Sequence, residues 1–394
     1  MVLVLFVSMR NRLVAWKSFA GLSLALLVLC VPALAQKKVL VRSTASPTTI
    51  SSTSSPSQTK SQQTTRRPAR RTRRTPVPVD PTKGDDASRD DAIVRAAAIA
   101  ALGNRAGSLV AIDPSNGRIL AIVNQKLAFE SYRPCSTFKP AVALAALEEG
   151  LIENNQNRLQ LGRRWYLNLI QSLTLSNNLY FEKLGGLLGL TKLHDYAERF
   201  GFGELASWGL PDESRGALPT KAPPAARGGV GRIASFGEGI KLTPLQLASF
   251  MSAVANGGTL FYLQYAPEEG RFEPLVKRRL EIGPWLHPVR QGLEEAVLTG
   301  TARTAKQPDV TILGKTGTCR QDGTRLGWFG GYSQRDGGLA VAVLLRGGLS
   351  SGPLAAGVAG RFYRTLADRN YVAQSAREPI RTAPPAAVQL SPLP

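Results

Sequence analysis

The sequence predicts an α+β fold in which a central antiparallel sheet is flanked by helices and carries a helical subdomain. Three observations lead to this prediction. An apolar hairpin stands early in the chain, the middle of the chain is mainly helical in pattern, and apolar strands followed by one helix return near the end. Strands at both ends need partners, so we expect them to share one sheet whose faces are covered by the helices.

The expected elements follow the chain in order. An alanine-rich run over 91–102 favours a first helix. The apolar runs 108–112 and 118–123 flank Asp113-Pro-Ser-Asn-Gly117, whose residue types are typical of a turn, and together they predict a hairpin. The remaining elements are helices at 136–149 and 248–256, a mainly helical stretch over 165–202, strands at 310–318, 327–332 and 339–345, and a last helix at 354–367.

The net charge of this 394-residue chain is +21, and it is unevenly placed. Residues 1–36 hold three basic and no acidic side chains, and residues 37–85 hold eleven basic against two acidic, so +12 lies before residue 86 and +9 after it. The charge of the folded part is therefore weak support for nucleic-acid binding, and we expect no nucleic-acid partner. With two histidines and three cysteines, neither a multi-histidine metal site nor a four-cysteine zinc cluster is expected, and no cofactor is implied.

Residues 1–35 have the pattern of a secretory targeting segment. Arg10, Arg12 and Lys17 precede an uncharged, mostly apolar run over 18–35 that closes with Ala33-Leu34-Ala35. A basic start, an apolar centre and small residues at the end are typical of a cleaved signal peptide. About 18 uncharged residues is also the lower limit for spanning a bilayer, so a signal anchor is the alternative. Both forms predict export to the periplasm or another extracytoplasmic space, with membrane anchoring through 18–35 in the second.

Two further segments lack the composition of a folded domain. Residues 36–85 are rich in Ser, Thr, Pro, Gln and Arg and predict a disordered basic tether. Its arginine cluster over 66–74 can hold an anionic envelope polymer or a membrane surface, or it can be a solvated linker. A Pro- and Ala-rich stretch over 376–394 predicts a disordered tail. Residues 86–375 are expected to form one domain.

The first candidate for chemistry is Ser136-Thr-Phe-Lys139 at a predicted helix start. Residues three apart on a helix share a face, and a lysine whose pKa is lowered by burial or by neighbouring charge can take the proton of a serine nucleophile. The helix N-terminus also favours the negative charge that develops on an attacked carbonyl. A capping serine followed by a surface lysine has the same pattern, so this motif by itself does not decide.

Two further short motifs follow it. Ser176-Asn177-Asn178 lies in an apolar helical context, where a helix cap or loop is the ordinary interpretation. Lys315-Thr316-Gly317 falls at the end of a predicted strand. Its lysine and threonine can hold a substrate carboxylate, and its glycine lets a ligand backbone approach the strand. A strand end with a turn glycine is the alternative.

Taken together and in this order, the three motifs are the signature of serine β-lactamases and penicillin-binding proteins. Over about residues 90–370 the sequence resembles the transpeptidase domain of penicillin-binding proteins, enzymes that cross-link peptidoglycan. The resemblance implies the fold shared by penicillin-binding proteins and β-lactamases. Further segments resemble parts of this domain in the same order: Val110-Ala-Ile-Asp-Pro-Ser-Asn-Gly117, Glu213-Ser-Arg-Gly216, Gly237-Glu-Gly-Ile-Lys-Leu-Thr-Pro-Leu-Gln-Leu247, Ala255-Asn-Gly-Gly258 and Gly327-Trp-Phe-Gly-Gly-Tyr332.

The resemblance also implies roles for the helical motifs. Ser136 would be the acylated nucleophile and Lys139 its proton acceptor. Ser176 and Asn178 would relay a proton to the leaving amine and bind the substrate's amide. The implied activity is that of a D,D-transpeptidase or D,D-carboxypeptidase on peptidoglycan stem peptides, with no cofactor.

On the strand, Lys315 and Thr316 would orient the carboxylate of a D-Ala-D-Ala end or of a β-lactam antibiotic. Gly317 belongs to the same substrate-binding edge. Thr318, together with Ser136, would supply backbone N–H groups to an oxyanion hole. Transpeptidation and carboxypeptidation share the acyl-enzyme and differ in whether an amine or water accepts it, so the sequence leaves both open.

Two other functions remain as alternatives. A serine β-lactamase needs a base for deacylation, and Glu213 lies 37 residues beyond Ser176, where one β-lactamase class has its glutamate. The Glu-x-x-Gly segment of penicillin-binding domains explains Glu213 better, because Ala217 stands where that class has an asparagine. A non-catalytic β-lactam sensor is the second alternative, and its sign would be a lost motif residue or a cytoplasmic signalling domain.

The cysteines add a further expectation from the resemblance. Cys135 directly precedes the candidate nucleophile and Cys319 follows Lys315 by four residues. The family's architecture makes that helix start and strand end neighbours, and some class A carbapenem-hydrolysing β-lactamases have a disulfide at the corresponding places. Cys30 would leave with a cleaved signal, which gives an even count in an oxidising compartment. A Cys135–Cys319 disulfide is therefore expected, with two buried thiols as the alternative.

Overall fold

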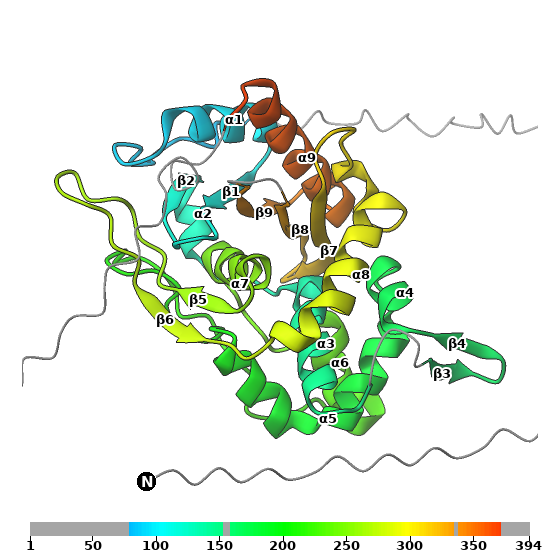
Figure 1. The fold of residues 1–394 in the computed structure, drawn as a ribbon. Helices are drawn as coiled ribbons and strands as arrows, with labels where there is room; N and C mark the ends of the chain where they lie inside the picture. Colours follow the sequence, from blue (N-terminus) through cyan, green and yellow to red (C-terminus); the bar gives the residue numbers. More distant parts are fainter. Residues whose placement is uncertain (1–78, 153–157, 335–337, 372–394) are drawn as a thin grey trace, which may run out of the picture. The chain divides into compact units, whose positions relative to one another are not determined.

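The computed structural model describes residues 79–152, 158–334 and 338–371. Within these ranges the central sheet consists of β1 (Gly107–Ile112), β2 (Ile119–Val123), β7 (Ile312–Gln321), β8 (Thr324–Ser333) and β9 (Ala340–Arg346). These strands form one antiparallel sheet in the order β2-β1-β9-β8-β7 (Figure 1). The pairing of β1 with β9 joins the two ends of the domain, and it confirms the predicted sheet and the α+β class.

Helices cover both faces of the sheet because its inner strands are apolar on both sides. Along β9, Val341 and Val343 belong to one buried cluster, and Ala342 and Leu344 belong to another. This is the period of two that makes a strand present alternate residues to opposite faces. The first cluster includes residues of α1 (Ala92–Leu102) and α9 (Gly352–Asp368), and the second includes much of α7 (Pro244–Asn256).

The remaining helices surround a buried central one. In α3 (Lys139–Glu148), every residue from Lys139 to Leu147 is buried, as expected for a helix that is apolar on nearly all sides. α5 (Asn178–Arg199) approaches α6 (Gly229–Phe236) closely, since a Cβ atom on Gly185 would lie 2.5 Å from Cβ of Ala234. The other helices of the described ranges are α2 (Gln125–Phe129), α4 (Leu169–Thr174), α5 (Asn178–Arg199), α6 (Gly229–Phe236) and α8 (Leu286–Leu298), and the two small hairpins are β3 (Leu159–Gly162) with β4 (Trp165–Leu167) and β5 (Thr259–Phe261) with β6 (Val276–Arg279).

The predicted helical stretch over 165–202 is wrong in its first residues. Trp165–Leu167 forms strand β4, which pairs with β3 across the turn residues Arg163 and Arg164. The side chain of Asn168 accepts from the N–H of Gln171 and caps α4, so the helix begins only after Asn168.

Residues 79–85, which composition assigned to the tether, contact the domain. The carboxylate of Asp85 accepts from the N–H groups of Asn124 and Gln125 at 2.9 and 2.8 Å, and it forms an ion pair with Arg95 at 2.9 Å. The folded part therefore extends to the amino side of Asp86. The predicted targeting segment, residues 36–78 of the tether and the tail lie outside the described residues. Among the helices that are described, none is long and apolar enough to span a bilayer.

Candidate active site

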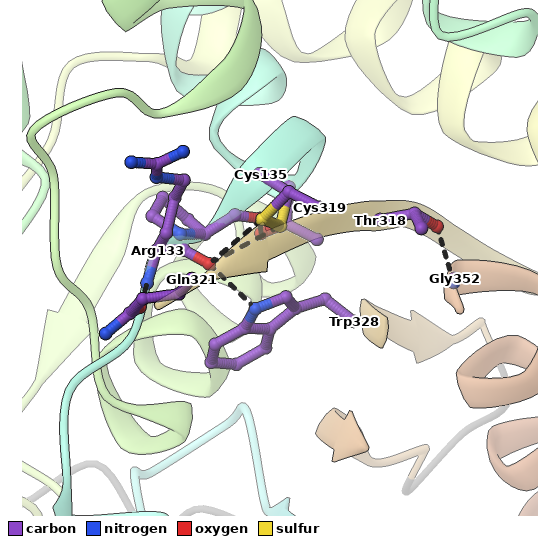
Figure 2. Close-up of a disulfide and its surroundings, with 9 residues drawn as sticks. Arg133, Cys135, Thr318, Cys319, Gln321, Trp328 and Gly352 are labelled. Atoms are coloured by element: carbon purple, nitrogen blue, oxygen red, sulfur yellow. Dashed lines mark hydrogen bonds between the residues drawn. A yellow bond between two sulfur atoms is a disulfide. The ribbon is translucent and has the colours of Figure 1, made fainter. Parts of the chain in front are cut away.

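The chain reaches Ser136 through a segment that is held against the edge of the sheet. The N–H of Arg133 donates to Oε1 of Gln321 at 2.8 Å, and the carbonyl of Arg133 accepts from Nε1 of Trp328 at 2.9 Å (Figure 2). Gln321 ends β7 and Trp328 lies on β8, where it is fully buried. The backbone before Ser136 is thus bonded to two neighbouring strands.

A disulfide strengthens the same contact. Cys135, in the short 3₁₀ helix η1 (Cys135–Phe138), is bonded to Cys319 of β7, with Cα atoms 5.7 Å apart (Figure 2). The structure therefore contains the pairing that the resemblance implied. Cys135 has a positive φ of 55°, an uncommon backbone conformation for a residue with a side chain. The disulfide holds this residue at the position directly before the candidate nucleophile.

Gly317 allows β7 to lie against the start of η1. A Cβ atom at Gly317 would lie 2.8 Å from the carbonyl oxygen of Pro134 and 3.3 Å from the backbone nitrogen of Ser136. Any larger residue would push the strand and the turn apart. The side chain of Ser136 is half-buried, and its hydroxyl has no hydrogen-bond partner among the described residues. The absence of a Cβ at Gly317 thus brings the two backbones together beside Ser136.

Lys139 links the first two motifs. Its side chain is fully buried, and Nζ donates to the carbonyl oxygen of Ser176 and to Oδ1 of Asn178, both at 2.7 Å. Oγ of Ser176 lies 3.2 Å from the same nitrogen. Burial, together with the positive charge of Lys315, lowers the pKa of Lys139 to about 6, while Glu182 acts in the opposite direction. At neutral pH this lysine is therefore mostly uncharged and can accept a proton.

Lys315 belongs to the sheet side of the site. It is fully buried on β7, and Nζ donates to the carbonyl oxygen of Thr316 at 3.1 Å. Burial lowers the pKa of Lys315 to about 7. The two lysines therefore lie close enough for the charge of one to lower the pKa of the other.

The threonines of β7 have their hydroxyls bonded to other segments. Thr316 is nearly buried and its hydroxyl donates to Oγ1 of Thr301 at 2.8 Å. Thr318 is exposed, and its Oγ1 accepts from the N–H of Gly352 at 2.7 Å, which satisfies a backbone donor at the start of α9. The structure thus joins Ser176 and Asn178 to Lys139 directly, sets Gly317 beside Ser136, and directs both threonine hydroxyls to residues outside the predicted motifs.

Sequence reasoning missed two residues that contact or influence this cluster. Glu182 stands four residues after Asn178, a spacing that puts both on one face of α5, and this spacing was a signal available from the sequence. Thr301 follows α8 and is remote in sequence from Thr316, so nothing in the local pattern indicated their contact. The described ranges contain no group of three or more His, Cys, Asp or Glu side chains placed to hold a metal ion.

Glu213, the candidate deacylation base of the β-lactamase alternative, is committed elsewhere. Its buried carboxylate accepts from the N–H groups of Ala206 and Ser207 at 3.1 and 2.8 Å and from the Ser207 hydroxyl at 2.6 Å. The hydroxyl of Thr243, the N-cap of α7, lies 3.4 Å from it. These bonds tie the loop before α6 to α7 and occupy the carboxylate.

A serine and a buried lysine on a helix, facing a lysine-bearing edge strand of an antiparallel sheet, define the class of active-site-serine proteins to which penicillin-binding proteins and serine β-lactamases belong. Within it, the family model for the penicillin binding protein transpeptidase domain matches residues 107–364. The chain belongs to this family.

Individual relatives agree with the family assignment. The chain is 31% identical to stage V sporulation protein D of Bacillus subtilis, over 54% of this chain and 39% of that protein. It is 25% identical to the peptidoglycan D,D-transpeptidase MrdA of Acinetobacter baumannii, over 61% of this chain and 45% of that protein. The alignments thus span less than half the length of these curated relatives.

Solved structures share the fold. The transpeptidase domain of penicillin-binding protein 3 from Burkholderia pseudomallei matches with a TM-score of 0.62 at 20% identity, over 75% of this chain and 98% of that one. The D,D-transpeptidase domain of a peptidoglycan glycosyltransferase from Eggerthella lenta matches with a TM-score of 0.57 at 22% identity, over 71% and 81%.

Proposed function

We propose that this protein is an exported active-site-serine acyl transferase that acts on the D-Ala-D-Ala ends of peptidoglycan stem peptides and is acylated by penicillin. Family membership supports this proposal, as do relatives that are named peptidoglycan D,D-transpeptidases. Transpeptidation is favoured over carboxypeptidation by those names, and both pass through the same acyl-enzyme on Ser136.

The observation that carries the proposal is the environment of Lys139. One helical turn separates Lys139 from Ser136, and Nζ is held by acceptors from Ser176 and Asn178. With its pKa lowered to about 6, the lysine is neutral at pH 7 without a histidine or a metal. A neutral amine in a buried site beside a serine is what activation of that serine requires.

In acylation, Oγ of Ser136 attacks the carbonyl of the penultimate D-Ala and its proton passes to Nζ of Lys139. The N–H groups of Ser136 and Thr318 stabilise the oxyanion, a role supported by the close approach of Gly317 to Ser136. The C–N bond then breaks. Ser176, bonded to Lys139, returns the proton to the leaving amine, while Asn178 holds the substrate amide.

The substrate carboxylate is assigned to Lys315 and Thr316 at the edge of β7. Lys315 has no carboxylate partner among the described residues, and a bound carboxylate would raise its lowered pKa and keep it charged. Deacylation by an amine completes a cross-link, and deacylation by water completes hydrolysis.

A serine β-lactamase is the second candidate, and the disulfide beside Ser136 is the observation that favours it. The β-lactamase is the weaker candidate because Glu213 is held by backbone and hydroxyl donors and is not available to activate water.

Export and attachment complete the proposal. The segment 1–35 would direct the domain out of the cytoplasm, either as a cleaved signal or as an anchor through 18–35. The basic cluster over 66–74 would bind an anionic envelope polymer or membrane surface.

Fluorescent penicillin tests the core of the proposal. Wild type should be labelled covalently, Ser136→Ala should not be, and Ser131→Ala should be labelled like wild type. Ser131 is a matched control because it is also half-buried and lies five residues upstream, with its hydroxyl 3.3 Å from that of Ser214. Labelling of Ser136→Ala would overturn the assignment. An acyl-enzyme that lasts minutes to hours supports a penicillin-binding protein, and rapid turnover would support the β-lactamase.

A further inference from the structure

The small hairpin formed by β3 and β4 projects from the domain and carries an unusual tip (Figure 1). Arg163 and Arg164 form its turn and are both exposed. Trp165 and Tyr166 follow directly, and each residue is 44% exposed. Neither aromatic ring makes a side-chain hydrogen bond or ring contact within the described residues. Two large adjacent aromatic side chains exposed in this way are uncommon for a surface that only meets water.

The base of the hairpin, by contrast, is firmly attached. Leu159 and Leu161 pack against the main hydrophobic core, and Leu167 is buried. Nζ of Lys183 on α5 donates to the carbonyl oxygen of Gln160 at 3.2 Å. The tip is therefore presented on a fixed support.

The two rings lie on opposite faces of the hairpin, because successive residues of a strand point to opposite sides. A rigid partner with a flat surface would contact only one of those faces. An environment that surrounds the tip contacts both. The arrangement thus favours insertion of the tip into a deformable environment that surrounds both rings, such as the headgroup layer of a bilayer.

The positive charge of this segment indicates that the surrounding environment is anionic. From Arg158 to Phe181 the sequence has three arginines and no acidic residue. Arg158, Arg163 and Arg164 are all exposed. Tryptophan and tyrosine are the side chains that settle at the headgroup level of a bilayer, and arginines there attract anionic lipid.

We propose that the tip of the β3–β4 hairpin docks into the headgroup region of an anionic lipid bilayer. A signal anchor over residues 18–35 would keep the domain within reach of such a surface. Docking would restrict the orientation of the domain relative to the membrane. The proposal does not depend on the chemistry at Ser136.

Hydrogen exchange of the full-length chain, measured by mass spectrometry, gives a readout that is local to the hairpin. The chain is incorporated in vesicles of phosphatidylcholine alone or of equal phosphatidylcholine and phosphatidylglycerol, so the amino-terminal segments are the same in both samples. Amides of residues 159–167 should exchange more slowly on the anionic vesicles. The protection factor is the exchange rate on phosphatidylcholine vesicles divided by the rate on anionic vesicles. In the double variant Arg163→Gln/Arg164→Gln this factor should fall by about fivefold per arginine, and so by about 25-fold for the pair.

Two further variants separate the aromatic contribution from general effects. Trp165→Ser/Tyr166→Ser should abolish the protection. Trp208→Ser should retain it, since Trp208 is also exposed but packs on Tyr262 elsewhere on the surface. A circular dichroism spectrum and a melting temperature equal to those of wild type show that each variant is folded. Equal exchange on both vesicles would overturn the proposal, and so would protection by purified peptidoglycan in the absence of lipid.

Discussion

The two halves of the site use the same residue type in different surroundings. Lys139 on the helical side and Lys315 on the sheet side are both fully buried, and burial lowers the pKa of each. Nζ of Lys139 lies within hydrogen-bond distance of three oxygens of the Ser176 motif, whereas Nζ of Lys315 donates to the carbonyl oxygen of the next residue, Thr316. Lys139 is thus oriented by protein partners, and the proposed function gives Lys315 a substrate carboxylate as its partner.

This difference supports the different steps proposed for the two lysines. A lysine fixed by several acceptors beside a serine is suited to proton transfer in the transition state. A buried lysine with spare donors is suited to bind an anion that arrives with the substrate. Four sets of variants and measurements test this difference between the two lysines.

The largest effect is expected from removing the proton acceptor. Lys139→Met should lower the rate constant of acylation by a fluorescent penicillin by about 10²–10⁴-fold, the usual contribution of a general base. Lys315→Met should instead raise the penicillin concentration needed for half-maximal rate. Lys183→Met, an exposed lysine on α5, is the control and should match wild type. Equal losses of the limiting rate in both site variants would show that the two lysines share one role.

The disulfide should contribute more to the free energy of unfolding than the other contacts between the helical and sheet sides of the site. Cys135→Ser/Cys319→Ser should reduce the free energy of unfolding by about 2–5 kcal/mol, because the cross-link closes a long loop in the unfolded chain. Urea unfolding at neutral pH measures this loss. The bonds of Arg133 to β7 and β8 remain in the variant, so acylation should be slowed less than it is by Lys139→Met. Unchanged stability would mean that those bonds alone hold η1 against the sheet.

Gly317→Ala tests the contact between the halves without changing any polar group. The new methyl group would meet the carbonyl of Pro134 at 2.8 Å, and overpacking of this kind costs about 1–3 kcal/mol. Both the melting temperature and the rate of penicillin acylation should fall. Gly186→Ala on α5 is the matched control, because nothing lies within 4 Å of the added atom there and alanine favours the helix. Normal acylation by Gly317→Ala would contradict the assigned oxyanion geometry.

The smallest effect is a shift in pH dependence. Acylation requires neutral Lys139, so its rate should rise with pH through an acid limb near the lysine's pKa of about 6. The charge of Lys315 lowers that pKa and Glu182 raises it. Lys315→Met should therefore move the limb to higher pH and Glu182→Gln should move it to lower pH, each by about one unit or less. Shifts in the same direction, or none, would show that the limb belongs to another group.

The fold could be predicted well from the pattern of apolar runs, since strands and helices of the sheet domain are long and strongly apolar. The error at Trp165–Leu167 has a local cause. Three residues are too few to show the alternating pattern of a strand. Asn168, which caps α4, has apolar residues on both sides, so the sequence did not mark it as a helix start. Residues 79–85 were misassigned to the tether because Asp85 is held by single hydrogen bonds and an ion pair, which composition does not reveal.

By itself the sequence determined the α+β class, the three motifs and their order, because periodicity and short-range spacing are local properties of the chain. Tertiary structure decided how those motifs meet. It buried both lysines and lowered their pKa values, turned the hydroxyls of Thr316 and Thr318 to Thr301 and Gly352, and engaged Glu213 with Ser207. Desolvation and contacts between distant segments depend on the whole packed chain, and so they cannot be read from any one stretch of it.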